Sequence, residues 1–172
     1  MQALRRSLEH LSQQWITQGV PSREQVMTSG QRLLQGRSAP ARQSLWSSAP
    51  RLVTASLDDS IGQGLEVIHL FARVMGLVVT PLGLMQRPEA ILAACHSHRP
   101  AYLGLTVLQP DSEEDLARIG LHLPPDTCLI AGGPAFRYDP EMAERCGVHY
   151  VAANVAYFID FVLNDARWTS LA

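Results

Sequence analysis

Three short segments hold the residue types that could bind a ligand. They are Asp58-Asp59-Ser60-Ile61-Gly62-Gln63-Gly64, Thr106-Val107-Leu108 and Gly132-Gly133. The glycines let a ligand approach the backbone closely, but the first segment is no G-x-G-x-x-G fingerprint because the third glycine is missing. With one hydroxyl and few charges, these segments favour a large, flat, mostly apolar ligand over a nucleoside triphosphate.

The residues that are missing exclude several chemistries. The chain has no lysine, and all 14 of its basic residues are arginine. Schiff-base chemistry, a lysine general base and a Walker A loop are therefore excluded. We recognise no Ser-His-Asp set, no pair of catalytic acids and no nucleophile with a nearby base. We expect that the chain is not a complete enzyme on its own, and that a bound cofactor would carry any chemistry.

Cysteine and histidine residues offer no convincing metal site. The three cysteines show no C-x-x-C pair and no zinc spacing, which favours a reduced, cytoplasmic protein: Cys95, Cys128 and Cys146. The tract Cys95-His96-Ser97-His98 holds ligand types, but neighbouring residues on a helix point to different faces. We also expect structural roles for His69, inside a helix, and for His149, at the start of a strand.

Alternating segments must position the three ligand-binding segments. Strands are predicted at 51–56, 77–82, 102–108, 127–131 and 149–152, and helices at 61–75, 88–98, 112–121, 140–145 and 155–163. Ser112 is the expected cap of the third of these helices. Strict alternation predicts an α/β fold, a flavodoxin-like (Rossmann-like) doubly wound parallel sheet with strand order 2-1-3-4-5. Ligands bind such sheets at the carboxyl ends of the strands, where all three segments would lie.

A helical segment precedes the alternating part. Leu4, Leu8, Leu11 and Trp15 share one face of a helix predicted at 2–18, and a second helix runs from a Ser22–Gln25 capping box to about Gln35. The Ser-, Ala-, Pro- and Arg-rich stretch that follows reads as a linker. The predicted organisation is a helical segment at 1–36, a linker at 37–50 and one domain at 51–172.

Charge and hydropathy limit the partners. Residues 1–51 carry seven Arg against two acids, whereas residues 52–172 carry seven Arg against fourteen acids. A nucleic-acid-binding domain would need its basic excess on the main domain, so we expect no nucleic-acid partner. No apolar stretch reaches the ~20 residues of a membrane span.

From residue 51 to about 165, the chain resembles the cobalamin (vitamin B12)-binding domain of methionine synthase, methylmalonyl-CoA mutase and corrinoid proteins. That family has D-x-H-x-x-G in its first loop, S-x-L after the third strand and G-G after the fourth. Here Asp59 and Gly64 match the first motif, Thr106-Val107-Leu108 the second and Gly132-Gly133 the third. The resemblance implies these cofactor contacts: Asp59, Ile61, Gly64, Leu82, Gly83, Thr106, Leu108, Gly132, Gly133 and Ala153.

One departure matters most. Ile61 occupies the position of the histidine that, in the family, replaces the cofactor's own dimethylbenzimidazole below the cobalt. An alkyl side chain cannot donate an electron pair to a metal. The resemblance then implies cobalamin held base-off without a histidine ligand, or base-on. The dimethylbenzimidazole tail would pass between strands beside Thr106, Leu108 and the double glycine.

Three hypotheses remain open on the sequence. The chain is a cobalamin binder acting as carrier, sensor or subunit with a protein partner, or a cofactor-free interaction module of the same fold, or a haem or other tetrapyrrole sensor. The helical segment could cap the cofactor, form a homodimer through the stripe of Leu4, Leu8, Leu11 and Trp15, or pack on the chain's own helices.

Overall fold

The computed structural model describes residues 2–36, 45–59 and 63–169. Two compact units are interleaved along the chain. One holds residues 1–50, 66–78 and 154–172, and the other holds 51–65 and 79–153. The boundaries that we predicted at 37 and 50 stay a prediction.

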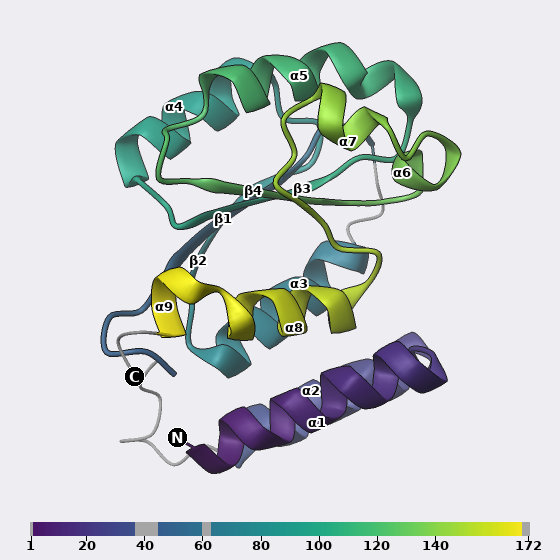
Figure 1. The fold of residues 1–172 in the computed structure, drawn as a ribbon, viewed down its shortest axis with the longest axis vertical. Coiled ribbons are helices and arrows are strands. Elements are labelled where there is room, and N and C mark those ends of the chain that lie inside the picture. Colours follow the sequence, from purple (N-terminus) through teal and green to yellow (C-terminus); the bar gives the residue numbers. More distant parts are fainter. Residues whose placement is uncertain (1, 37–44, 60–62, 170–172) are drawn as a thin grey trace. The chain divides into compact units, whose positions relative to one another are not determined.

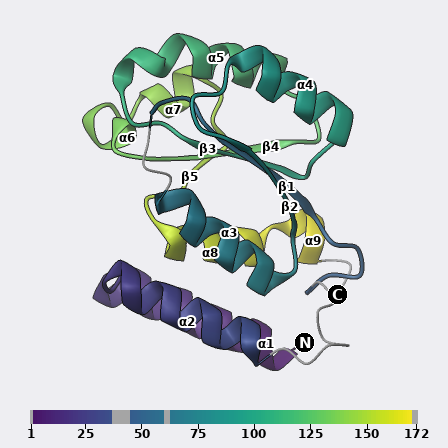
Figure 2. The same ribbon diagram turned by 180° about the vertical axis from the view of Figure 1, so that it is seen from behind.

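The second unit is built on a five-stranded sheet. Its strands are β1 (Arg51–Ser56), β2 (Val78–Gly83), β3 (Tyr102–Thr106), β4 (Cys128–Gly132) and β5 (Tyr150–Val151). They lie in the order β2-β1-β3-β4-β5. Figures 1 and 2 show the sheet from opposite sides. The pairs β1–β3, β3–β4 and β4–β5 are parallel. The predicted fold class and strand order are confirmed.

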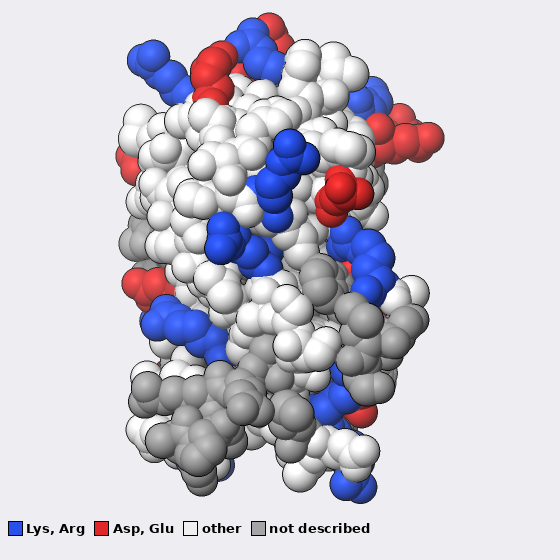
Figure 3. Space-filling model, turned by 90° about the vertical axis from the view of Figure 1, so that its left-hand side faces the viewer, with Lys and Arg blue, Asp and Glu red and all other residues white. Residues whose placement is uncertain are grey.

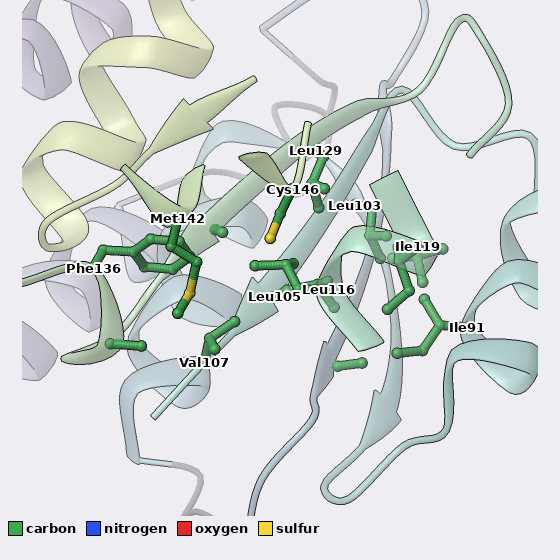
Figure 4. Close-up of a cluster of buried hydrophobic side chains, with 14 of the residues drawn as sticks. Ile91, Leu103, Leu105, Val107, Leu116, Ile119, Leu129, Phe136, Met142 and Cys146 are labelled. Carbon is green, nitrogen blue, oxygen red and sulfur yellow. The ribbon is translucent and has the colours of Figure 1, made fainter. Parts of the chain in front are cut away.

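Two helices cover one face of this sheet. α4 (Pro88–His98) and α5 (Glu113–His122) lie side by side above the strands in Figure 1. Figure 4 shows the apolar side chains of β3 and β4 pointing toward those of the helices, and they are at most 3% exposed: Leu103, Leu105, Leu129, Ile91, Leu116 and Ile119. Burial of this apolar area stabilises the layer, and it accounts for the continuous apolar runs of the strands.

Short elements complete the second unit and differ from the prediction. A 3₁₀ turn, η2 (Pro110–Ser112), precedes α5, and β3 ends at Thr106 instead of continuing to residue 108. The predicted helix at 140–145 is reduced to α7 (Met142–Arg145), and a further turn, α6 (Ala135–Tyr138), follows β4. Pro110 begins η2, because its φ angle suits a first helical position, and Pro134 directly precedes α6.

The first unit is helical. It contains α1 (Gln2–Gln18), α2 (Arg23–Gln35), α3 (Gln63–Met75) from Glu66 onward, α8 (Val155–Asn164) and α9 (Ala166–Thr169). The predicted capping box is present, because Ser22 and Gln25 exchange hydrogen bonds at the start of α2. Asn154 caps α8 by accepting from the N–H groups of Ala156 and Tyr157. None of the described helices is long and apolar enough to span a membrane.

The apolar stripe of α1 is used within this unit. Leu8 is fully buried and Trp15 is 5% exposed. The Trp15 ring meets Phe71 of α3 edge to face, with centroids 5.7 Å apart. Gln13 also donates to Asp160 of α8 over 2.9 Å. The stripe therefore packs on the chain's own helices.

His69 of α3 should lower the stability of the fold as the solution becomes acidic. Its half-burial, together with Arg73, lowers its pKa below the ordinary value of 6.5. The unfolded chain then binds the proton more readily, so stability is lost as the pH falls from about 6.5 through the folded-state pKa. In the folded protein, NMR should give a His69 midpoint below 6.5, and His69→Gln should flatten this part of the pH dependence. A midpoint at or above 6.5 would contradict the assignment.

The cysteine thiols should be nearly inert in the folded protein. Cys95, Cys128 and Cys146 are all buried thiols. Burial raises the pKa of Cys95 to about 11, and burial followed by the nearby Glu113 raises that of Cys146. Because the thiolate is the reactive form, an aromatic disulfide reagent at pH 8 should label the folded chain slowly and all three cysteines after denaturation. Rapid labelling of the folded chain would contradict this burial.

Candidate functional site at the carboxyl edge of the sheet

The carboxyl ends of three strands bring the predicted segments together. Ser56 of β1 lies in register with Thr106 of β3, and Thr106 lies in register with Gly132 of β4. The loop after β1 therefore begins beside Thr106 of the second segment and Gly132 of the double glycine. The motifs predict that these segments meet at the carboxyl ends of the strands, and the strand register agrees with this. The role of each residue toward a ligand stays a prediction.

A carboxylate ties two of these loops to each other. Asp58 accepts a hydrogen bond from the Leu108 N–H over 2.6 Å and another from the Ser112 hydroxyl over 2.6 Å. The Ser56 hydroxyl, buried at the end of β1, donates to the Asp58 carbonyl and tightens the same turn. We call this set of contacts the Asp58 clasp. It holds the loop after β3 at a defined place against the loop after β1.

The clasp corrects one expectation and adds Asp58 to the residues of this edge. Ser112 directly precedes α5, but its side chain makes no capping hydrogen bond, because the hydroxyl is directed to Asp58 instead. The motif alignment had selected Asp59, which is exposed on the surface. Two adjacent aspartates look alike in the sequence. Only their distance from the end of β1 decides which one turns toward the neighbouring loop, so Asp58 was missed.

Ile61 and Gly64 are the other two positions of the first motif. Ile61 lies outside the described residues. Gly64, in the first turn of α3, is exposed, and a Cβ added there would meet nothing within 4 Å. Its small size leaves open space next to the loop, and the packing of the chain does not require it.

The double glycine has a structural cause. Gly133 has a φ of +125°, and a Cβ there would lie 2.1 Å from the carbonyl oxygen of Val107. A Cβ on Gly132 would lie 2.8 Å from the Ala152 carbonyl oxygen. The Val107 N–H also donates to the Gly132 carbonyl over 2.9 Å. The backbone therefore approaches Gly133 from Val107 and Gly132 from Ala152 so closely that packing alone requires both glycines.

Small and apolar groups make up the rest of the edge. Thr106 and Leu108 are half-buried beside the clasp, and Ala153, which follows β5, is exposed. Leu82 is half-buried near the end of β2, and Gly83 is exposed with a φ of +103°. The loop after β2 is joined to β1, because the Gln86 N–H donates to the Ser56 carbonyl over 2.9 Å.

The acidic cluster beside the edge is explained without a ligand. Glu113, Glu114 and Asp115 form the first turn of α5, where carboxylates favour the helix dipole. Arg145 bridges Glu113 and Asp139 over 2.7 Å and 2.5 Å. Its hydrogen bond lowers the pKa of Asp139. On the face drawn in Figure 3, arginine and acidic side chains both occur among the described residues, some of them side by side and others among uncharged ones.

The histidine-rich tract is also structural in its contacts. Cys95 is fully buried in the core, whereas the exposed His96 ring lies 3.2 Å from the His122 carbonyl. His149 Nδ1 accepts from the Leu129 N–H over 3.0 Å, before the start of β5 and away from the carboxyl edge. Across the described residues, no group of three or more His, Cys, Asp or Glu side chains is placed to hold a metal ion.

Comparison by sequence and comparison by structure give different results. A scan of protein-family models finds no match for this chain, and a search of curated proteins finds no relative. Among solved structures, the chain is similar to a cobalamin-binding protein from Desulfitobacterium hafniense DCB-2, with a TM-score of 0.76 and 16% identity. That match covers 94% of this chain and 78% of the other, so it includes most of the N-terminal helical segment.

A second neighbour is the monomethylamine corrinoid protein of Methanosarcina barkeri. It matches with a TM-score of 0.59 and 16% identity, over 93% of this chain and 79% of its own. A pilus assembly-related protein from Burkholderia pseudomallei K96243 matches less of this chain, 66%, with a TM-score of 0.51. At such identities the comparisons establish the fold, and they confirm the fold resemblance to cobalamin-binding domains that the sequence motifs indicate.

Proposed function

We propose that this chain is a cobalamin (corrinoid)-binding protein that acts as a carrier, sensor or subunit and does not ligate cobalt through histidine. The observation that carries the proposal is the carboxyl edge itself. There the end of β1 lies in register with Thr106 of β3, and Thr106 with Gly132 of β4, on the strand order β2-β1-β3-β4-β5. The similarity of fold to two corrinoid-binding structures supports the same ligand class.

The residues at this edge fit a corrinoid. They are small or apolar, or they carry one polar group. At Gly64 a side chain would extend into open space, and glycine leaves that space free. We assign ring contacts to Leu82, Gly83 and the loop that holds Asp59, Ile61 and Gly64. We assign the nucleotide tail to Thr106, Leu108, Gly132, Gly133 and Ala153. The tail would pass between strands beside these residues, as the family resemblance implies.

The donor set argues against a histidine ligand to cobalt. None of the segments 57–64, 84–87, 107–109 and 132–134 contains a histidine. The half-buried carboxylate of Asp58 already accepts hydrogen bonds from two donors in the clasp. The cofactor would therefore be bound base-off with an unligated lower face, or base-on. It would supply the organometallic chemistry, and this chain would bind and orient it for a separate enzyme or regulator.

A cofactor-free interaction module is the second candidate. The observation in its favour is that steric contacts with Val107 and Ala152 already account for both glycines of the third motif. An ancestral site could then persist for reasons of folding alone. A cytoplasmic location, expected from the sequence, remains part of the proposal, and a homodimer through the N-terminal helices stays an untested alternative.

Retention of the cofactor separates these two candidates. The purified chain is mixed with hydroxo-, methyl- or adenosylcobalamin, passed through gel filtration and examined by visible spectroscopy, with haemin as a competitor. We expect one equivalent of cobalamin to elute with the protein and to resist haemin. A protein that is folded by circular dichroism but retains no cobalamin would favour the interaction module, and preferential retention of haemin would favour the tetrapyrrole sensor.

A further inference from the structure

In the loop after β2, Met85 combines a strained backbone conformation with an exposed apolar side chain. Met85 has a φ of +52°, the left-handed region that L-residues with long side chains rarely adopt. Its side chain is 65% exposed, and Leu84 beside it is 38% exposed. The chain therefore keeps a methionine where a glycine or a polar residue would cost less.

A comparison with Arg99 shows that the conformation of Met85 needs another explanation. Arg99, with a φ of +45°, is the other non-glycine residue with a positive φ among those described. It ends α4, and its N–H donates to the Cys95 carbonyl, an ordinary left-handed helix cap. Met85 ends no helix. Strained residues that persist without such a cause are concentrated at ligand-binding sites.

Anchors on both sides hold Met85 at the carboxyl edge. The Gln86 N–H donates to the Ser56 carbonyl at the end of β1, and the Gln86 side-chain amide donates to the Leu84 carbonyl over 2.9 Å. Gly83, with a φ of +103°, provides the turn on the other side. Because Ser56 also begins the turn that contains Asp58, the loop stands next to the clasp.

We infer that Met85 is a ring-contact residue, which packs its thioether against the flat face of the corrin macrocycle. A thioether is flexible and polarizable, and it makes favourable contacts with flat conjugated rings. The inference rests on the proposed function and deepens it. The Met85 contact would supply part of the corrin affinity that an axial imidazole supplies where one is present.

Met85→Gly should separate binding from folding. Glycine removes the strain and the contact together, so the melting temperature should rise while affinity falls. The probe is dicyanocobinamide, a corrin without the nucleotide tail, so that ring contacts are measured alone. The bound corrin would largely bury the Met85 side chain. Loss of this side chain should therefore weaken cobinamide binding about tenfold.

Arg99→Gly is the matched control. It relieves the same kind of strain at the end of α4, which leads into the amino end of β3, so it should raise the melting temperature and leave cobinamide binding unchanged. Met85→Leu should keep most of the affinity, because an apolar contact is what the inference requires.

The outcomes are distinguishable. If the unaltered chain binds no corrin, the proposed function fails and this inference fails with it. If the unaltered chain binds cobinamide and Met85→Gly binds it equally well, the inference fails alone. If Met85→Leu loses as much affinity as Met85→Gly, a specific role of the sulfur replaces the packing contact and the inference is overturned.

Discussion

Gly133→Ala should destabilise the fold by about 3 kcal/mol, the sum of a left-handed backbone penalty and an overpacking penalty. The φ of +125° is unfavourable for any residue with a Cβ. The added Cβ would also lie 2.1 Å from the Val107 carbonyl, a backbone atom that cannot rotate away. Denaturation by guanidinium, followed by circular dichroism, measures this loss as a lower transition midpoint.

Gly64→Ala is the matched control for this prediction. It belongs to the same set of motif glycines, but its Cβ would meet nothing within 4 Å. In the first turn of a helix, alanine should be neutral or stabilise by up to about 0.5 kcal/mol. Equal stabilities of the two variants would show that the Val107 carbonyl does not approach Gly133 as closely as described.

Opening the Asp58 clasp should loosen the edge of the sheet locally. Asp58→Ala removes the acceptor of the Leu108 N–H and the Ser112 hydroxyl, both at 2.6 Å. Charge-assisted hydrogen bonds of this kind are worth more than neutral ones, so we expect a loss of about 2 kcal/mol after allowance for partial hydration. Hydrogen exchange at the Leu108 amide should accelerate more than exchange at the centre of β3.

The neighbouring aspartate provides the control. Asp59 is exposed, so Asp59→Ala should change stability by no more than about 0.5 kcal/mol and leave the Leu108 amide protected. Ser112→Ala should fall between the two, because it removes one of the two donors. If Asp59→Ala proved the more harmful variant, the clasp would be assigned to the wrong carboxylate.

The periodicity of the chain predicts the architecture well. β1 and α4 begin and end where a short β-branched run and the Pro88 start signal place them, and the capping box at Ser22 forms as expected. These elements agree because local propensity and burial favour the same structure. The short turns α6 and α7 were poorly predicted, since a four-residue helix carries too little periodicity to be recognised.

The candidate site was predictable as a place but not as a set of contacts. Motif spacing brings Thr106 and Gly132 to the same edge, as the strand register shows. The choice between Asp58 and Asp59 depends on which way one residue turns after β1. The strain at Met85 depends on hydrogen bonds between loops far apart in the sequence, which no local pattern reveals.

The electron paramagnetic resonance spectrum of the chain loaded with Co(II) cobinamide tests the central claim most directly. Cobinamide carries no nucleotide base, so in a nitrogen-free buffer an axial nitrogen splitting could come only from a protein imidazole. We predict a cobalt signal that elutes with the protein and shows no axial nitrogen splitting. A resolved nitrogen splitting would contradict binding without histidine, and the absence of any cobalt with the folded protein would contradict corrinoid binding itself.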